Sequence, residues 1–526
     1  MTDIVAENPI LYGDFPDPDI IRVGDEYFMA TTTMHFTPGC DILRSPDLVH
    51  WQFAAHAFDS LEDTADERLE NPGKNAYGQG MWAPSLNYHG GTFYVTFTAN
   101  DTHKTYLLQA ENPAGPWRKS TIEGFYHDNG LLFDDDGRVY IVYGNMTLRL
   151  TELTADLRGP LPGGLDRVIA VDDPHAGLGY EGSHLYKING RYYVMSCHFP
   201  ANHRKTEACM MANSLHDDFV IREVLDDDLG FHGFGVAQGG MVDTPDGRWY
   251  GFMMQDRGAV GRVLTLMPMR FDIDGFPVFG DNGRVEQQVR VPQVSRATKV
   301  GALNGNRFTR PATSGPTDDP SVLEPYWQFN HIAHAGLWRV DPRDDSFHLR
   351  SGRISDNINH AWNTLTQRTV GPKTVAEVTL DGSSLHEGDI AGLAAFQGCY
   401  SYIALTADAQ GRYRLVVDYK PAKNDSIFSD NDWDETAHRD CALNINVPVV
   451  RLRAVYDFTD GADVVSFSYR PVECDHDDAW IPLGAPHRLY YKMDHFTGCR
   501  VGMFLYSSTS IGGEAAFSRF TTVTQT

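Results

Sequence analysis

The sequence is poor in basic residues, and this shortage excludes whole classes of partner. Its 526 residues include 44 lysines and arginines against 70 aspartates and glutamates, so the formal net charge at pH 7 is −26. Nucleic-acid binding depends on clusters of cations, and an acidic surface also disfavours anionic membranes. We therefore expect neither nucleic acid nor a membrane among the partners of this chain.

The sequence also has few cysteines and no long apolar runs. Its seven cysteines are scattered and include no CxxC pair, which favours free thiols in a reducing compartment and argues against a disulfide framework or a structural zinc site. The first residues lack the basic and apolar segments of a secretory signal, and no window approaches 18 apolar residues. These features predict a cytoplasmic location.

What the sequence does have is an internal repeat. Five times in the first half, a turn is followed by an aromatic-rich apolar run, over residues 24–30, 91–97, 137–143, 190–195 and 247–253. Successive copies are 66, 46, 53 and 57 residues apart, and units of that length hold about four strands, the size of a propeller blade. The repeat predicts a five-bladed β-propeller; an irregular array of β-sandwich hairpins is the alternative.

The second half of the chain has the pattern of a separate β domain. Turn-forming and polar residues are concentrated in 306–325, which predicts a linker. Beyond it, alternating stretches such as 373–380 and 450–456 predict the short strands of a β-sandwich. We therefore predict an all-β chain with a propeller over 1–305 and a β-sandwich over 326–526.

The repeat places five residues at equivalent positions. Counting back 12 residues from the second aromatic of each run, or 11 in the first run, gives Asp17, Trp82, Asp128, Glu181 and Gln238. The innermost strands of a propeller line its axis, so these side chains should converge on one site. Three carboxyl groups at one point cannot all be ionised at little cost, and unequal protonation is what an acid–base pair needs.

The surroundings of these residues resemble glycoside hydrolase family 43. The matching segments are 8–19, which contains Asp-Phe-Pro-Asp-Pro-Asp, then 45–51, 81–85, 180–187 and 256–262. In the second half, 363–369 is similar to the sandwich appended in the xylosidase/arabinofuranosidase branch. The resemblance implies a five-bladed propeller that hydrolyses arabinosides and xylosides with inversion.

Carried over residue by residue, the resemblance assigns three catalytic roles. Asp17 is the expected general base, Glu181 the general acid, and Asp128 the residue that orients the acid and favours its protonated form. This division makes physical sense, because an inverting glycosidase needs its base and its acid on opposite faces of the sugar, about 6.5–9.5 Å apart.

Five further side chains are candidates for substrate contact: His35, Trp82, Gln238, Arg262 and Phe496. Trp82 offers a flat apolar face to a sugar ring, and Arg262 can hydrogen-bond hydroxyls or a carboxylate. His35 lies in a segment that walls the sugar pocket in relatives, and Phe496 lies in one that resembles a loop reaching the site from the C-terminal domain. Each has a structural alternative, and for Phe496 it is packing inside the sandwich.

Two positions depart from the family pattern, since relatives often carry histidine where Gln238 and Arg257 stand. The glutamine weakens the case for a calcium ion in the propeller channel, so we expect no required cofactor and no metal. The arginine is expected to alter affinity or specificity.

The leading hypothesis is an exo-acting, inverting hydrolase that releases α-L-arabinofuranosyl residues from arabinoxylan-derived oligosaccharides. A β-xylosidase acting on xylo-oligosaccharides with the same acids is the first alternative. A non-catalytic, lectin-like propeller is the second, which loss of any of the three acids would have favoured. The expected partners are neutral pentose oligosaccharides, and the sequence leaves open whether the chain forms a homo-oligomer.

Overall fold

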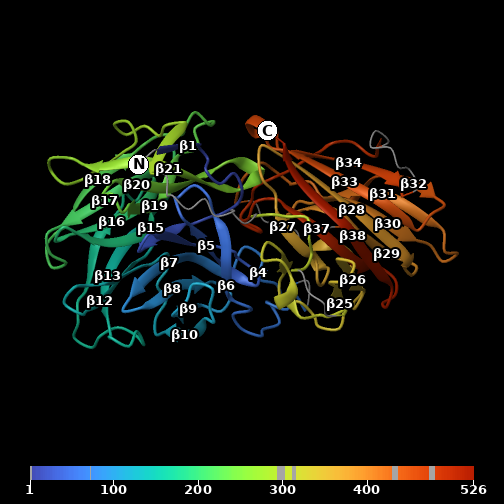
Figure 1. Ribbon diagram of the computed structural model, residues 1–526, viewed down its shortest axis with the longest axis horizontal. Helices are drawn as coiled ribbons and strands as arrows, with labels where there is room; N and C mark the ends of the chain where they lie inside the picture. Colours follow the sequence, from blue (N-terminus) through green and yellow to red (C-terminus); the bar gives the residue numbers. More distant parts are fainter. Residues whose placement is uncertain are drawn as a thin grey trace.

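The computed structural model describes residues 3–70, 73–292, 303–310, 315–428, 436–472 and 480–525. Within these residues the secondary structure is β throughout, apart from four short 3-10 turns: η1 (Gly258–Val260), η2 (Pro320–Val322), η3 (Ile358–His360) and η4 (Thr459–Gly461). None of the described residues forms a helix long and apolar enough to cross a membrane. Two β domains lie side by side along the long axis of the molecule (Figure 1).

The first domain is a ring of five four-stranded antiparallel sheets, which confirms the predicted propeller. The first three blades are built from β2 (Asp19–Val23), β3 (Glu26–Thr31), β5 (Gly39–Ser45) and β6 (Gln52–Phe58); β7 (Met81–His89), β8 (Thr92–Ala99), β9 (Lys104–Ala110) and β10 (Arg118–Ile122); and β11 (Gly130–Phe133), β12 (Val139–Tyr143), β13 (Thr147–Leu153) and β14 (Asp166–Val171).

The last two blades follow the same plan. They consist of β15 (Leu178–Ile188), β16 (Arg191–Phe199), β17 (Thr206–Ala212) and β18 (Val220–Leu225), then β19 (Val236–Asp243), β20 (Trp249–Asp256), β21 (Arg262–Phe271) and β22 (Pro277–Phe279). Each of the five aromatic runs forms the second strand of its blade. The hairpin turn before each run contains a glycine with positive φ, which that residue adopts without a steric penalty.

The ring is held closed by the start of the chain. β1 (Asp3–Glu7) pairs with β23 (Gln288–Pro292) in a two-stranded sheet outside the blades. The amide of Asn8 then exchanges two hydrogen bonds with the backbone of Leu266 on the last blade, of 2.8 and 2.9 Å. Because these bonds imitate a strand ladder, they fix the segment that leads to Asp17 against the fifth blade.

The second domain is a sandwich of two large antiparallel sheets around one apolar core, as predicted. One sheet has the order β32-β31-β30-β29-β37-β27-β24-β4 and the other β25-β26-β38-β28-β33-β34-β35, with β36 also paired to β34. Their strands are β24 (Gln328–Asn330), β25 (Trp338–Asp341), β26 (Ser346–Arg350), β27 (Leu365–Arg368), β28 (Lys373–Ser384), β29 (Asp389–Phe396), β30 (Ser401–Ala407), β31 (Tyr413–Tyr419), β32 (His438–Ile445), β33 (Val449–Asp457), β34 (Val464–Pro471), β35 (Ile481–Pro482), β36 (His487–Arg488), β37 (Arg500–Ser507) and β38 (Glu514–Gln525).

The two domains share a sheet. The propeller strand β4 (Phe36–Thr37) pairs with β24 at the edge of the sandwich, and a buried ion pair joins Asp41 of the propeller to Arg368 of the sandwich at 2.6 Å. Phe308, from the interval expected to be a linker, is buried in the sandwich core; residues 311–314 of that interval lie outside the described residues. The two domains are therefore joined by direct contacts and not only by the segment that connects them in the chain.

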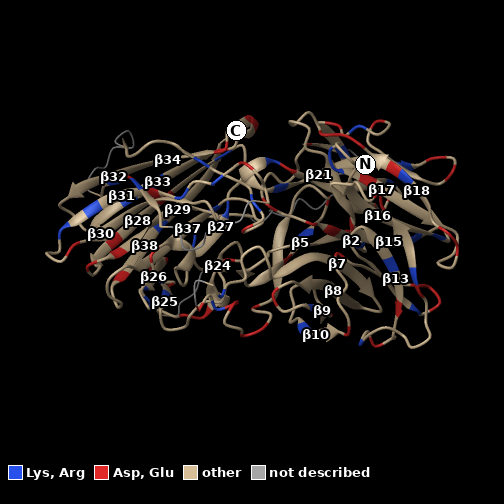
Figure 2. Ribbon diagram, turned by 180° about the vertical axis from the view of Figure 1, so that it is seen from behind, with Lys and Arg blue, Asp and Glu red and all other residues tan. Residues whose placement is uncertain are grey.

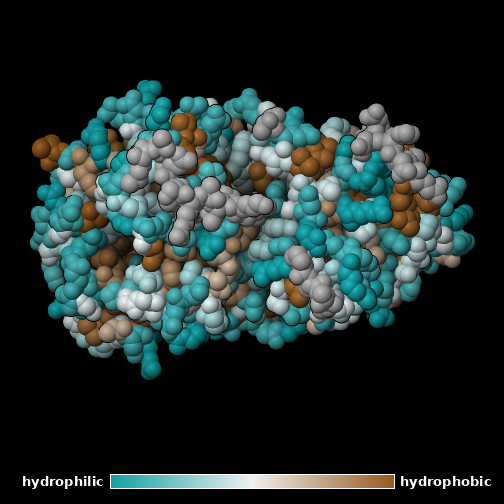
Figure 3. Space-filling model, in the orientation of Figure 1, coloured by the Kyte–Doolittle hydropathy of each residue, from teal (hydrophilic) through white to brown (hydrophobic). Residues whose placement is uncertain are grey.

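Acidic and basic residues are both distributed over strands and loops of the two domains (Figure 2). The face seen in Figure 3 is mostly hydrophilic with scattered apolar residues.

Candidate active site

The five equivalent residues all lie at the start of the innermost strand of a blade. Asp17 and Asp128 lie two residues before β2 and β11, whereas Trp82, Glu181 and Gln238 lie within β7, β15 and β19. Segments of all five blades line one small cavity of about 10 Å³, close to the size of a single water molecule. The lining residues are Asp17, Ala83, Pro84, Asp128, Asn129, Gly182, Ser183, His184 and Gln238.

The same backbone feature marks all five positions. In each blade, either the equivalent residue or the one after it has a left-handed backbone: Asp17 (φ 50°), Ala83 (φ 39°), Asp128 (φ 47°), Gly182 (φ 65°) and Gln238 (φ 64°). The strand register shifts at this point in the second, fourth and fifth blades. Such irregularities re-aim a side chain and are common next to active sites, so the local strain turns these residues toward the axis.

The expected general base is held by two buried side chains. Gln238 Nε2 donates to Asp17 Oδ1 at 2.8 Å, and Arg262 Nη1 donates to both carboxylate oxygens at 3.0 and 3.2 Å. Gln238 is held in turn, because its backbone N–H donates to Glu207 Oε2 at 2.7 Å. Burial raises the pKa of Glu207 to about 8. Asp17 is therefore fixed in orientation, with the guanidinium beside it compensating a negative charge.

Asp14, three residues before the base, connects the two domains at the site. Its Oδ1 accepts the backbone N–H of Arg262 at 2.9 Å, and its Oδ2 accepts that of Gly498 at 2.8 Å. A side chain at position 498 would collide with the carbonyl of Val260, so only glycine allows this approach. Asp14 thus fastens a loop of the sandwich beside the arginine that binds the base.

The acid side is held more loosely. Asp128 is 4% exposed, and its Oδ1 has no hydrogen-bond partner among the described residues. His127 Nε2 lies 3.7 Å from both Asp128 Oδ1 and Glu181 Oε2. Burial raises the pKa of the Asp128 carboxyl, with a further contribution from Glu181 and an opposing one from His127. The Asp128 carboxyl in turn raises the pKa of His127 to about 9 against the effect of burial.

Glu181 is anchored through its backbone and through one oxygen. Ser196 Oγ donates to the backbone carbonyl of Glu181 at 2.7 Å, and the amide of Asn145 donates to Oε2. The side chain is 15% exposed, which leaves it accessible from the mouth of the propeller. A carboxyl that is accessible and close to a second, buried carboxyl suits the exchange of a proton with a substrate.

An aromatic wall stands beside the acids, and it comes from both domains. The ring of Phe496 lies 5.3 Å from that of Trp82, and the guanidinium of Arg262 lies over the Phe496 ring at 4.4 Å. Arg262 Nη2 also donates to the Phe496 carbonyl at 3.3 Å. The structure therefore places Phe496 against the propeller site and not inside the sandwich.

His35 is not brought to the acids, which corrects the expected substrate contact. The side chain is 4% exposed, and its ring packs against those of Phe36, Tyr77, His331 and His495 where the domains meet. Burial lowers the pKa of His35 well below its usual value. The segment that contains it leads into β4, so tertiary pairing draws it into the interdomain core.

A metal would find one set of ligands among the described residues: donor atoms of His127, Asp128 and Glu181 lie within 4.8 Å of one another. A histidine at position 238 would suit an ion in the channel. The residue there is Gln238, and its amide donates to Asp17. The same three residues, His127, Asp128 and Glu181, also suit proton transfer.

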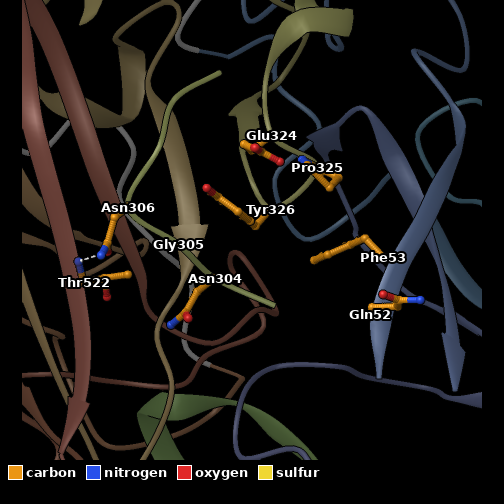
Figure 4. A pocket seen from close by; sticks show the side chains of 9 residues that line it. All are labelled: Gln52, Phe53, Asn304, Gly305, Asn306, Glu324, Pro325, Tyr326 and Thr522. Atoms are coloured by element: carbon orange, nitrogen blue, oxygen red, sulfur yellow. Dashed lines mark hydrogen bonds between the residues drawn. The ribbon is translucent and has the colours of Figure 1, made fainter. Parts of the chain in front are cut away.

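Another cavity lies away from these acids. It measures about 480 Å³, lies between the domains, and is lined by Gln52, Phe53, Asn304, Gly305, Asn306, Glu324, Pro325, Tyr326 and Thr522 (Figure 4). Only one of these lining residues, Glu324, carries a carboxyl group, so this cavity offers no acid–base pair.

Sequence reasoning missed Asp14, His127, Asn145 and Glu207. Asp14 and His127 could have been suspected from their position next to the repeat residues. Asn145 comes from the turn between β12 and β13 and Glu207 from β17, and no sequence signal singles them out.

Comparison with known proteins assigns both domains to known families. The family model for glycosyl hydrolases family 43 matches residues 6–277, and that for the beta xylosidase C-terminal concanavalin A-like domain matches 318–522. The chain belongs to glycoside hydrolase family 43. It is therefore an enzyme that hydrolyses glycosidic bonds.

Individual family 43 relatives have more than one activity in their names. A beta-xylosidase of Formosa agariphila is 26% identical over 461 residues, which are 78% of this chain and 76% of the relative. A non-reducing end alpha-L-arabinofuranosidase of Bacteroides ovatus is 27% identical over 432 residues, 78% of this chain and 75% of the relative. A solved structure described as a bifunctional GH43-CE protein of Bacteroides eggerthii is 34% identical, with a TM-score of 0.88. The match covers 100% of the present chain and 64% of the Bacteroides eggerthii chain.

Proposed function

We propose that this family 43 enzyme is an exo-acting, inverting α-L-arabinofuranosidase that acts on arabinoxylan-derived oligosaccharides. The observation that carries the catalytic part is the contrast between Asp17, fixed by Arg262 and Gln238, and Glu181, which is accessible beside the buried Asp128. The exo mode is supported by the wall of Phe496 and Trp82, since an aromatic edge at the mouth blocks extension of the sugar chain.

In this mechanism Asp17 acts as the general base and Glu181 as the general acid. Asp17 accepts a proton from a water molecule as the water oxygen bonds to the anomeric carbon. Glu181 gives its proton to the glycosidic oxygen as the bond from that oxygen to the anomeric carbon breaks. Water attacks the face opposite the leaving group, so the configuration inverts. Glu181 then regains a proton and Asp17 loses one, which returns both groups to their starting states.

The second candidate is a β-xylosidase with the same catalytic acids. It is favoured by the names of several relatives, including the protein of Formosa agariphila. We prefer the arabinofuranosidase because the Thr-Met-His segment at 33–35 and the Gly-Ala-Val-Gly-Arg segment at 258–262 resemble those of that branch of the family.

Two measurements test the proposal. With the 4-nitrophenyl α-L-arabinofuranoside and β-D-xyloside, kcat/KM should be higher for the arabinofuranoside; a higher value for the xyloside would establish the second candidate. NMR of the first product should show the inverted anomer, and retention would contradict the roles of Asp17 and Glu181. Activity should survive dialysis against EDTA, because no step requires a metal.

A further inference from the structure

The turn between β12 and β13 brings a side chain to Glu181 that nothing in the repeat pattern predicts. Asn145 lies in this turn, in the third blade, and its amide nitrogen donates to Oε2 of Glu181 in the fourth. It is an exposed residue, so the packing of the blade does not require an asparagine there.

The turn is clamped on both sides of Asn145. The backbone N–H of Gly144 donates to the carbonyl of His127 at 2.9 Å, and that of Met146 donates to the carbonyl of Tyr180 at 3.2 Å. The carbonyl of Met146 accepts the N–H of Asp172 at 2.9 Å. These bonds join the turn to the residue before Asp128 and to the residue before Glu181, so Asn145 is positioned by the same backbone that positions both carboxyl groups.

Close approach is built into this clamp. A Cβ at position 179 would lie 2.4 Å from the Cα of Met146, so Gly179 allows the turn to lie directly against β15. Met146 itself has a left-handed backbone, with φ 66°. Strain and close packing of this kind persist where a geometry is fixed by its surroundings.

The contact has a chemical consequence for the acid. In a neutral carboxyl group the oxygen without the proton is the stronger acceptor, so the amide N–H of Asn145 favours the form of Glu181 in which Oε2 carries no proton. His127 Nε2 lies on the same side, 3.7 Å from the same oxygen. A neutral Glu181 therefore keeps its proton on Oε1, away from both groups.

We propose that Asn145 is a positioning residue that holds Oε2 of Glu181 and thereby fixes Oε1 as the oxygen that protonates the leaving group. This inference rests on the proposed role of Glu181 as the general acid. It predicts that replacing Asn145 lowers kcat more for a leaving group that needs protonation than for one that needs little.

The test compares substrates with the same pentose and different leaving groups. A dinitrophenyl pentoside needs little protonation, whereas an oligosaccharide leaves as a poorly acidic alcohol. In Asn145→Ala and in Asn145→Leu, which keeps the shape without the donor, kcat on the oligosaccharide should fall about 10–100-fold, with KM little changed. On the dinitrophenyl pentoside, kcat should fall by less than about threefold.

The controls separate this inference from the proposed function. Asn444→Ala removes another exposed asparagine, whose side chain accepts a hydrogen bond from Arg414 in the sandwich, and should leave activity on both substrates unaffected. Glu181→Gln should lose far more activity on the oligosaccharide than on the dinitrophenyl pentoside. If that variant loses both equally, Glu181 is not the acid and both proposals fail. If it behaves as expected but the Asn145 variants lose both activities equally, or neither, the positioning role alone is overturned.

Discussion

The two sides of the active site are built in opposite ways. On the base side, Asp17 receives three hydrogen bonds from two buried side chains, and the glutamine among them is held by a further buried carboxyl. On the acid side, His127 lies 3.7 Å from each of two carboxyl groups, and one oxygen of Asp128 has no hydrogen-bond partner among the described residues.

This difference matches what each side has to do. A base that activates water must point in one direction, and multiple charge-assisted hydrogen bonds fix both its direction and its charge. An acid must carry a proton when the substrate binds, and hydrogen-bond donors to all of its oxygens would favour the ionised form instead. The comparison predicts that the base side tolerates change least.

The largest effect is expected at Asp17. Asp17→Asn removes the proton acceptor and leaves Arg262 without its buried carboxylate, so kcat should fall about 10³-fold. Asp128→Asn keeps an oxygen at this buried position, where Oδ1 has no hydrogen-bond partner among the described residues. Its kcat should therefore fall only about 10–100-fold. Steady-state kinetics of both variants, with circular dichroism to verify folding, checks the ranking. Less than a tenfold loss in Asp17→Asn would contradict the assignment of the base.

A smaller effect is expected at the aromatic wall. Phe496→Ala opens the mouth and removes the ring beneath the Arg262 guanidinium, but it leaves the hydrogen bonds of Arg262 to Asp17 and to the backbone at 496 in place. KM should therefore rise about tenfold while the melting temperature stays within a few degrees. The matched control is Phe504→Ala, because Phe504 is fully buried in the sandwich; that change should cost about 3–5 kcal/mol of stability. If Phe496→Ala instead lowers the melting temperature and leaves KM unchanged, the pocket belongs to the propeller alone.

The effect furthest from catalysis is on stability against acid, and it concerns the buried histidines where the two domains meet. Burial lowers the pKa of His331 to about 3, and the Nε2 of this ring accepts the N–H of Ala76 at 2.9 Å, which requires the neutral form. Below pH about 6.5 the unfolded chain binds a proton at this ring and the folded chain does not. The free energy of unfolding therefore decreases as the pH falls from about 6.5 toward 3, by up to about 1.4 kcal/mol per pH unit.

Denaturant unfolding at pH 7, 6 and 5 measures this contribution. In His331→Gln the decrease should be smaller than in the wild type, because one titrating ring is gone. An identical slope in both proteins would show that His331 does not contribute.

The sequence by itself determined the propeller and the position of its acids. Each blade is a local object, made by a glycine turn and an aromatic strand that follow one another in the chain, so its pattern can be read without knowing the rest. The equivalent position then selects Asp17, Trp82, Asp128, Glu181 and Gln238, and the structure gathers their segments around one cavity.

Only the tertiary structure decided what surrounds those residues. The bond from Gly498 to Asp14 spans 484 positions in the chain, and the burial of His35 follows from pairing between β4 and the second domain. Asn145 reaches Glu181 because two blades pack side by side with a clamped turn between them. Periodicity carries information along the chain, whereas these contacts join segments whose order in the sequence says nothing about their distance in space.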